Sequence, residues 1–319
     1  MRIAVFGTGG VGGYFGGRLA QAGHNVTFIA RGAHLEAIRR DGLRVESLAG
    51  DFHVAPADAT ADASAVGAVD LVLVGVKAPQ VPEAARAIRS MVGAETVVLP
   101  LQNGVEAADQ LVGVLGSKPV VGGLRKLIAM IGGPGRIRHL GMPPQIVFGE
   151  LDNRPSERIA RIKSLFDECQ GVEARVAEDI HAALWGKFLF IAAFSGVGAV
   201  TRVPAGVMRS VPETRQLIQE AMNEIRALAL ARGVRLADDV VARSMAAVDA
   251  LPSEGTASMQ RDIMAGRPSE LSAQNGAVVR LAAEAGISVP VNGFLYRALI
   301  AQEKLARGEI DLAAPPEKT

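Results

Sequence analysis

The chain has 319 residues, of which 49% are hydrophobic and 21% charged, with a formal net charge of +1 and one cysteine, Cys169. This length and composition are typical of a globular protein with two domains or one large one. The near-neutral charge and the lack of a Lys/Arg-rich run argue against a nucleic-acid partner. One cysteine cannot form an intrachain disulfide, so the cytoplasm is the expected compartment.

The opening stretch, MRIAVFGTGGVGGYFGG, predicts a strand, a glycine turn and a helix in immediate succession. Gly7, Gly9 and Gly12 form the dinucleotide fingerprint G-x-G-x-x-G directly after the apolar strand. In this interpretation Gly7 allows the turn, Gly9 lets a pyrophosphate approach the backbone, and Gly12 lets the helix pack on the strand. A glycine-rich turn without a ligand is the alternative. The predicted phosphate-binding residues are Gly7, Thr8, Gly9, Gly10, Val11 and Gly12. Since the chain starts on this strand, we expect no secretory signal peptide.

The segment from Asn25 to Ala30 predicts a second parallel strand, and Arg31 follows it. An NAD-binding domain usually has a carboxylate at this strand end, whereas arginine accommodates the 2′-phosphate of NADP. The first acidic residue downstream is Glu36, which we do not expect to reach the ribose. The sequence therefore predicts NADPH as the cofactor. The alternative is that Arg31 is only solvated.

Two further buried strands, Asp70 to Val76 and Thr96 to Leu101, end at the edge where open α/β sheets bind ligands. Lys77 follows the first strand, and its side chain faces either the cofactor or solvent. Asn103 follows the second strand. Its amide can donate and accept at once, which suits a nicotinamide or a substrate carbonyl, and an Asn-Gly turn is the alternative.

The remaining elements up to Ala177 are predicted from their apolar patterns and turn residues. They are a helix at Leu35 to Arg40, a hairpin of Leu43 to Ser47 with Phe52 to Ala55 outside the main sheet, a surface connection at Asp58 to Ala65, a helix at Pro82 to Met91, strands at Val120 to Met130, Gly135 to His139, Gln145 to Phe148 and Val172 to Val176, and a helix at Ser156 to Glu168.

Beyond Ala177 the chain reads as helix, with Asp179 as an N-cap and a polar tail, Ala313 to Thr319, that we expect to fray. The apolar run Phe188 to Val200 falls short of the roughly 20 residues that cross a bilayer, so we expect a buried helix and no membrane association. The predicted helices are His181 to Val200, Thr214 to Arg232, Ala237 to Leu251, Glu270 to Ala285 and Asn292 to Arg307.

The expected fold class is α/β, with a Rossmann-type dinucleotide-binding domain at residues 1–177 and an all-helical domain at 178–319. The five histidines are scattered along the chain, so we expect no metal site.

Several motifs, spread in order along nearly the whole chain, resemble those of the ketopantoate reductase (2-dehydropantoate 2-reductase) family. They are GTGGVGG at 7–13, VGVKA at 74–78, LQNG at 101–104, PGRIRHLG at 134–141, LWGK at 184–187, and SMQRDIMAGRPSE at 258–270 followed by NG at 275–276. The resemblance implies that a Rossmann domain and a helical domain enclose the NADPH-dependent reduction of ketopantoate to pantoate, in pantothenate and coenzyme A biosynthesis.

The resemblance also implies roles for single residues. Lys187 matches the family's catalytic lysine, which protonates the alkoxide formed from the ketone, and Glu270 matches its acidic partner. Burial of Lys187 in an apolar helix makes its charge costly, which favours release of the proton. The implied substrate contacts are Lys187, Asn103, Ser195 and Ser258, and the implied cofactor contacts beyond the glycine loop and Arg31 are Lys77, Asn103 and Ala129.

Four positions depart from the family pattern. Asparagines are expected one and two turns after the catalytic lysine, where this chain has Ile191 and Ser195. Ala205 and Gly255 also stand where relatives carry pocket asparagines. Two substrates therefore stay open, ketopantoate itself and a related 2-oxo acid with a more apolar tail. A cofactor-binding regulatory protein without turnover is disfavoured because the catalytic groups are present. The expected partner is the small-molecule 2-oxo acid, and a homodimer is the assembly to be tested.

Overall fold

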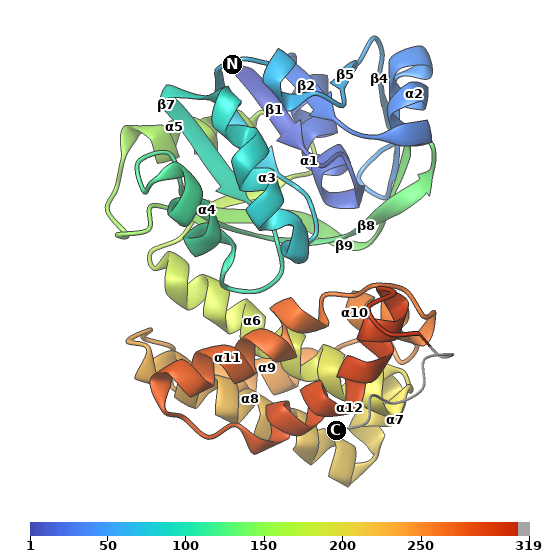
Figure 1. Cartoon of the computed structure of the whole chain (residues 1–319), viewed down its shortest axis with the longest axis vertical. Helices are drawn as coiled ribbons and strands as arrows, with labels where there is room; N and C mark the ends of the chain where they lie inside the picture. The colour runs from blue at the N-terminus through green and yellow to red at the C-terminus, as the bar shows by residue number, and fades with distance from the viewer. Residues whose placement is uncertain (312–319) are drawn as a thin grey trace. The chain divides into compact units, whose positions relative to one another are not determined.

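The computed structural model describes residues 1–311, which form two compact units (Figure 1). Unit 1 comprises Met1–Gln102 and Glu106–Ala183, and unit 2 comprises Asn103–Val105 and the chain from Leu184 onward. The division therefore lies between Ala183 and Leu184, whereas the sequence analysis placed it at Ala177. The tail Ala313 to Thr319, predicted to fray, lies outside the described residues.

The main sheet of unit 1 has five parallel strands in the order β5-β2-β1-β6-β7. Successive residues of its central strands are buried on opposite faces, because side chains alternate along a strand. In β1, for example, Ile3 and Val5 join one core cluster and Ala4 and Phe6 the other. The strands are β1 Arg2–Phe6, β2 Asn25–Ile29, β5 Asp58–Thr60, β6 Val69–Val74 and β7 Val92–Pro100.

One prediction for this sheet was wrong. The segment Asp58 to Ala65, expected to be a surface connection, begins with the edge strand β5, in which Ala59 pairs with Phe28 of β2. Three residues are too few to show a period-two pattern, and the surrounding turn formers favoured a loop.

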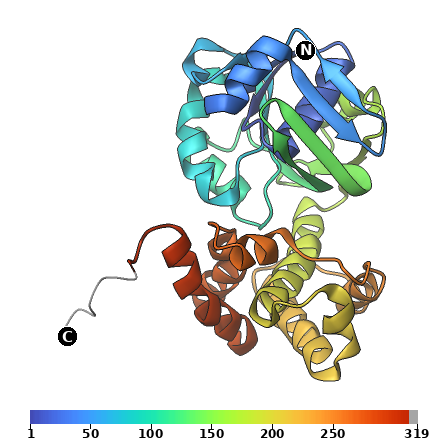
Figure 2. The ribbon, with the colours of Figure 1, turned by 90° about the vertical axis from the view of Figure 1, so that its right-hand side faces the viewer.

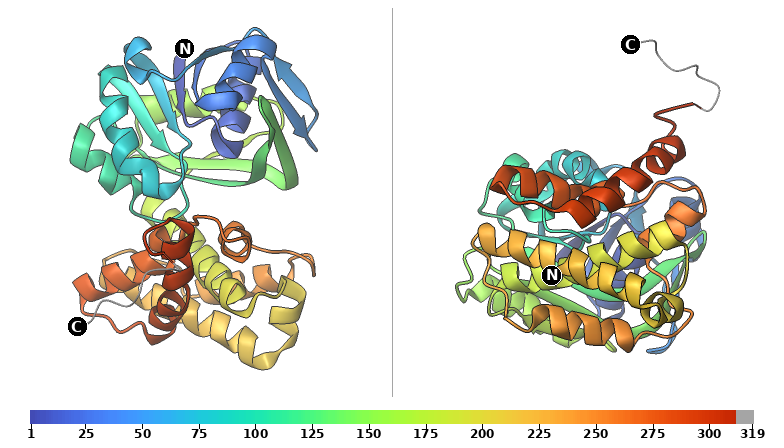
Figure 3. Two further views of the ribbon diagram at one scale, coloured as in Figure 1. Left: turned by 45° about the vertical axis from the view of Figure 1, so that its right-hand side comes forward. Right: turned by 90° about the horizontal axis from the view of Figure 1, so that it is seen from below.

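A second five-stranded sheet contains β3 Leu43–Ser47, β4 Phe52–Val54, β8 Gly122–Gly133, β9 Arg136–Gly149 and β10 Glu173–Val176. The antiparallel β3–β4 hairpin is confirmed outside the main sheet. The strand predicted at Val172 to Val176 is β10, which pairs with β9 in this second sheet. The long β8–β9 pair is the green hairpin of Figure 2 and of the left panel of Figure 3.

The strands predicted at Gly135 to His139 and Gln145 to Phe148 are one continuous strand, β9. Gly141 and the prolines at 143 and 144 suggested a turn between them. The irregularity is a bulge in β9 itself, since Leu140 pairs with Ile128 and Gln145 with Lys126, so that residues 141–144 lie opposite a single residue of β8.

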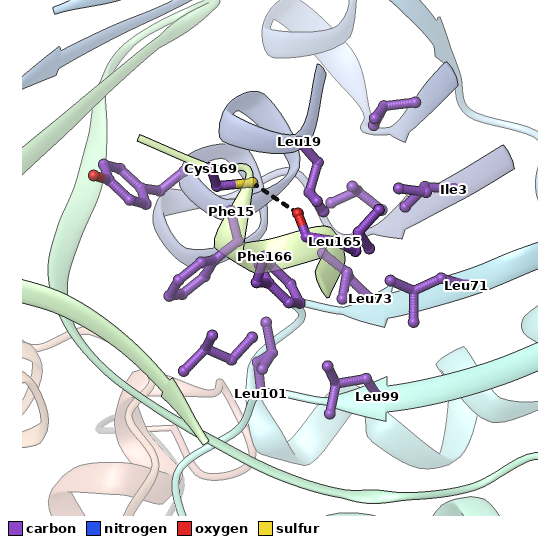
Figure 4. Close-up of a cluster of buried hydrophobic side chains, with 14 of the residues drawn as sticks. Ile3, Phe15, Leu19, Leu71, Leu73, Leu99, Leu101, Leu165, Phe166 and Cys169 are labelled. Atoms are coloured by element: carbon purple, nitrogen blue, oxygen red, sulfur yellow. Dashed lines mark hydrogen bonds between the residues drawn. The ribbon is translucent and has the colours of Figure 1, made fainter. Parts of the chain in front are cut away.

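Two helices, α1 Gly10–Gln21 and α5 Glu157–Asp167, contribute to the core that joins both sheets (Figure 4). The ring of Phe15 in α1 meets that of Phe166 in α5 edge to face, with 6.2 Å between the ring centroids. Phe15 makes a second edge-to-face contact with Tyr14, at 5.6 Å. Beside them the thiol of Cys169 donates to the carbonyl of Leu165. Burial, with the nearby charge of Glu168, raises the pKa of Cys169 to about 12, so this thiol is an inert core group.

Helices α3 Val81–Ile88 and α4 Ala107–Leu115 pack together on the other face of the main sheet (Figure 1). The sequence analysis did not predict α4. Helix α2 Gly32–Asp41 follows β2, and short 3₁₀ turns within residues 1–311 are Ala63–Ala65, Ala78–Gln80, Arg89–Met91 and Leu271–Ala273.

Unit 2 is helical among its described residues, as expected (Figure 3). Asp179 caps α6, since its side chain accepts from the N–H of Ala182 at 3.0 Å. Glu270 was predicted to start a helix, but it precedes the 3₁₀ turn Leu271–Ala273 that leads into α11. The helices are α6 Ile180–Thr201, α7 Ala205–Ser210, α8 Pro212–Ala231, α9 Val240–Asp249, α10 Ser258–Met264, α11 Asn275–Ala285 and α12 Pro290–Ala306. The short helices α7 and α10 were not predicted.

Helix α6 has 22 residues and a mean hydropathy of 1.6, so by length and composition it could cross a membrane. The predicted apolar run, Phe188 to Val200, is the C-terminal part of this longer helix, which also contains His181 and Lys187. However, 61% of the apolar window is buried. A Cβ on Gly196 would lie 2.7 Å from the Asn275 amide, and one on Gly198 equally close to Gln260, so polar side chains of α11 and α10 pack tightly on α6.

Candidate functional site: a glycine loop and a lysine cluster

The glycine loop of unit 1 is tied to the end of β2. Gly7 has a φ of +97°, in the region that favours glycine, and turns the chain out of β1. The N–H groups of Gly7 and Thr8 donate to the carbonyl of Ile29 at 3.2 and 3.1 Å, and the Thr8 hydroxyl donates to it at 3.0 Å. These bonds fix the loop at the carboxyl end of two neighbouring strands.

The glycines of the loop differ in the space around them. A Cβ on Gly12 would lie 2.2 Å from the carbonyl oxygen of Gly7, and one on Gly10 would lie 2.3 Å from that of Ala129. A Cβ on Gly9 would meet nothing within 4 Å. The loop is therefore packed tightly against β1 and β8 and open at Gly9.

The start of α1 has the features of an anion site. Its first helical bond runs from the N–H of Gly13 to the carbonyl of Gly9, at 2.7 Å. The preceding N–H groups of the first turn, which include those of Gly10 and Val11, lie outside the i to i−4 ladder. Together with the open approach at Gly9, these donors fit a pyrophosphate.

Two exposed cations follow β2 and β6, the strands on either side of β1 in the main sheet. Arg31, with 75% of its side chain exposed, lies 3.5 Å from the carboxylate of Glu83, and such an exposed pair contributes little. Lys77 follows β6 and is exposed, and its N–H donates to the Gln80 side chain at 3.2 Å. Glu36 pairs with Arg39 at 3.9 Å.

Gln102 has a positioning role that sequence reasoning missed. Its side-chain amide donates to the carbonyls of Val74 and Val76, at 2.8 and 2.9 Å. It thereby holds the carboxyl ends of β6 and β7 together. The signal in the sequence was a buried strand, TVVLPL, that ends on a glutamine.

In unit 2 the chain brings Lys187, Asn103 and Glu270 together. The Lys187 ammonium donates to Asn103 Oδ1 at 3.0 Å, and Asn103 Nδ2 donates to Glu270 Oε2 at 2.9 Å. The orientation of the Asn103 amide follows from chemistry, because an ammonium only donates and a carboxylate only accepts. One neutral amide therefore links a cation to an anion in a largely buried cluster.

Backbone geometry places Asn103 beside Glu270. Gly104 has a φ of +100°, and a Cβ there would lie 2.9 Å from the carbonyl oxygen of Ala273. Asn103 therefore lies in an Asn-Gly bend and also donates through its side-chain amide to Glu270, so the bend does not exclude a role for the amide. On the other side of Glu270, the N–H of Ser269 donates to the buried carboxylate of Glu303 at 3.1 Å.

Gln274 was also missed by the sequence analysis. Its side chain is fully buried, and its Nε2 lies 3.5 Å from Glu270 Oε2. The chain of hydrogen bonds in this part of the structure thus runs from Lys187 through Asn103 and Glu270 to Gln274. We call these four residues the lysine cluster.

The other predicted substrate residues lie apart from these bonds. Ser195 is fully buried on α6, and its hydroxyl has no partner among the described residues. Ser258 is exposed at the first position of α10. Ala205 and Gly255 are joined by a 2.9 Å backbone hydrogen bond, and a Cβ on Gly255 would lie 3.8 Å from that of Ala205.

No group of three or more His, Cys, Asp or Glu residues in 1–311 could hold a metal ion.

Comparison with known proteins identifies relatives over most of the chain. The family described as "Ketopantoate reductase PanE/ApbA" matches residues 3–153, and "Ketopantoate reductase PanE/ApbA C terminal" matches residues 179–303. The 2-dehydropantoate 2-reductase of Mesorhizobium japonicum is 32% identical over 303 residues, which cover 88% of this chain and 91% of that protein.

Comparison with solved structures points to the same family. The crystal structure of a PanE/ApbA family ketopantoate reductase from Ralstonia eutropha JMP134 matches with a TM-score of 0.88 and 34% identity, covering 96% of this chain and 100% of that one. A D-mandelate dehydrogenase solved with NADH and anilino(oxo)acetate matches with a TM-score of 0.86 at 23% identity, over 96% and 100% of the two chains, which shows a shared fold.

Proposed function

The chain belongs to the ketopantoate reductase family of oxidoreductases, and on this premise we propose that it catalyses the NADPH-dependent reduction of ketopantoate to pantoate. This reaction would serve pantothenate and coenzyme A biosynthesis in the cytoplasm. The observation that carries the proposal is the hydrogen-bonded series of Lys187, Asn103 and Glu270.

Unit 1 supplies the groups that hold NADPH, whose chemical contribution is a hydride for the ketone carbon. The N–H groups at the start of α1 would hold the pyrophosphate, and the open space at Gly9 would leave room for it. Arg31 would hold the 2′-phosphate, since its cation follows β2 and its exposed pair with Glu83 is weak enough to be replaced. Lys77, at the end of β6, and Ala129, beside Gly10, complete the proposed cofactor contacts.

Unit 2 supplies the proton. When the ketone carbon gains a C–H bond, the carbonyl electron pair moves to oxygen, and Lys187 donates the proton that makes it a hydroxyl. Asn103 orients the ammonium, and Glu270 balances its charge through the same amide. Lysine is left neutral and regains a proton from water, so the net reaction consumes one hydride and one proton. Ser195 and Ser258 are the proposed hydroxyl contacts to the substrate.

Steady-state kinetics with a panel of branched 2-oxo acids, each with NADPH and with NADH, test the proposal. We expect turnover of ketopantoate with NADPH as the preferred cofactor. The proposed function fails if none of the 2-oxo acids is reduced with either cofactor.

A second candidate, reduction of a related 2-oxo acid with a more apolar tail, is favoured by Ile191. This half-buried side chain stands one turn after Lys187, where the family pattern has an amide. If the apolar contact matters, Ile191→Asn should raise kcat/KM for ketopantoate several-fold relative to 3,3-dimethyl-2-oxobutanoate, which lacks only the hydroxyl. Val207→Asn, at an exposed position on α7, is the control and should not change this ratio.

A further inference from the structure

We propose that Gln274 is a specificity-determining residue whose side-chain oxygen accepts a hydrogen bond from a hydroxyl on the tail of the substrate. The inference rests on the proposed function and selects between its two candidates. It assigns the site to a hydroxylated 2-oxo acid even though Ile191 and Ser195 replace two amides of the family pattern.

The first argument is that the Gln274 amide has an unmet acceptor. Its side chain is fully buried, and its Oε1 has no hydrogen-bond partner among residues 1–311. The orientation of the amide follows from Glu270, whose carboxylate accepts hydrogen bonds and so requires the NH₂ group to face it. The oxygen must then point away from the carboxylate. A buried acceptor without a donor is unfavourable, so a ligand that brings a donor gains affinity there.

The second argument comes from the chemistry of the substrate. The carboxylate and the ketone of a 2-oxo acid only accept hydrogen bonds, so neither can satisfy Gln274 Oε1. A hydroxyl on the tail is the one group of ketopantoate that can donate to it. Gln274 is also close to the reacting groups, since it contacts Glu270, which is linked to Lys187 through Asn103.

The third argument is that Gln274 is held weakly. Its bond to Glu270 is 3.5 Å long, at the upper limit for a hydrogen bond. A small rotation of the amide toward a substrate therefore gives up little interaction. Glu270, which Gln274 contacts, retains 9% exposure.

Gln260, a second fully buried glutamine of unit 2, is a matched control. Its Nε2 donates to the carbonyl of Val203 at 2.9 Å, and its Oε1 accepts from the N–H of Ala257 at 3.3 Å. Both ends of this amide are paired, as expected of a structural glutamine. The two residues thus have the same type and burial but differ in the pairing of their oxygens.

The kinetic test compares ketopantoate with 3,3-dimethyl-2-oxobutanoate in wild type, Gln274→Met and Gln260→Met. The ratio of kcat/KM for the two substrates should fall by about tenfold or more in Gln274→Met, because methionine keeps the volume and loses the acceptor. Gln260→Met should leave the ratio unchanged. An unchanged ratio in Gln274→Met overturns the inference, as does an equal fall in both variants.

Thermal unfolding supplies a readout that does not depend on turnover. Gln274→Met should leave Tm unchanged or raise it, because it removes an unpaired acceptor, whereas Gln260→Met should lower Tm by leaving two backbone groups unpaired. If Gln274→Met lowers Tm as much as Gln260→Met, the Gln274 oxygen is paired within the protein and the inference is wrong. Absence of turnover in the wild type would instead reject the proposed function, and the unfolding comparison would still decide whether the acceptor is unmet.

Discussion

The glycine loop of unit 1 and the lysine cluster of unit 2 build polar sites in opposite ways. The loop depends on the absence of side chains, since glycines let backbone groups approach each other and leave one side of the loop open at Gly9. The cluster depends on side chains that are present, because Asn103 links the half-buried charge of Lys187 to the buried charge of Glu270.

This difference determines which substitutions each site tolerates. In the loop the damaging change is an added methyl group, and its effect depends on the atoms that the new Cβ would meet. Among Lys187, Asn103 and Glu270 the damaging change is the loss of a group, because a charged side chain then loses a hydrogen-bond partner. Substitutions in both places can therefore separate binding, chemistry and stability.

The largest expected effect comes from the cluster. Lys187→Ala should lower kcat by a factor on the order of 10² or more, because the alkoxide loses its proton donor. Lys187→Arg keeps the charge, but a guanidinium does not release its proton, so a similar loss of kcat is expected. NADPH binding, measured by fluorescence titration, should be largely retained in both variants.

Lys163→Ala, at a surface position on α5, is the control and should have wild-type kinetics. Near-normal turnover in Lys187→Ala would remove Lys187 from the role of general acid. Recovery of most of the rate in Lys187→Arg would show that the residue supplies charge rather than a proton.

The same contrast explains what could be predicted from the sequence. The strands of the main sheet and the glycine loop were predictable because each depends on contiguous residues with a clear pattern. The short edge strand β5 and the continuity of β9 were not, because three residues carry no period and the Gly-Met-Pro-Pro segment resembles a turn. The start of α11 was also misplaced, since Glu270 lies ahead of a 3₁₀ turn.

The lysine cluster could not be derived from spacing. Asn103 is 84 positions from Lys187 and 167 from Glu270, and no periodicity joins residues so far apart. The roles of Lys187 and Glu270 came from the family resemblance, whereas Asn103 was also indicated by its place after a buried strand. The amides of Gln102 and Gln274 were missed because their importance lies in hydrogen bonds that only the fold reveals.

A second prediction sharpens the contrast within the loop. Gly12→Ala should destabilise the protein by about 1 to 3 kcal/mol, because the new Cβ would lie 2.2 Å from a backbone oxygen that cannot move easily. Gly9→Ala has open space around it and should leave the free energy of unfolding within about 0.5 kcal/mol of wild type. It should instead weaken NADPH binding, since the methyl group stands where the pyrophosphate approaches. Denaturant unfolding and cofactor titration measure the two effects, and equal destabilisation by both substitutions would contradict this account.

A third prediction concerns cofactor choice. Arg31→Glu should lower the ratio of kcat/KM for NADPH over NADH by about tenfold or more, because a carboxylate repels the 2′-phosphate and accepts from a ribose hydroxyl. Glu83→Gln removes the exposed partner of Arg31 and should keep or increase the NADPH preference. If the wild type uses both cofactors equally, or if Arg31→Glu leaves the ratio unchanged, Arg31 does not bind the 2′-phosphate.

The smallest expected effect is on the pH dependence of protein stability, to which His34, near the glycine loop, contributes. The Nδ1 atom of His34 accepts from the N–H of Gly135 at 3.0 Å. Burial lowers the pKa of His34 below its ordinary value, and hydrogen bonding to the backbone of Thr8 and Gly133 opposes this shift in part. The unfolded chain therefore binds a proton more readily than the folded protein. Stability is retained above the ordinary histidine pKa of about 6.5 and decreases as the pH falls below it.

His34→Asn keeps an acceptor for Gly135 without a group that titrates in this range. The fall in Tm between pH 7.5 and 5.5 should then be smaller than in wild type by about 1 to 2 °C, a modest difference because the imidazole is only partly buried. His53→Asn, at an exposed position, should leave the slope unchanged. A steeper fall in His34→Asn would mean that the folded protein favours the charged imidazole, and the effect of burial would then be outweighed by the carbonyls that surround it.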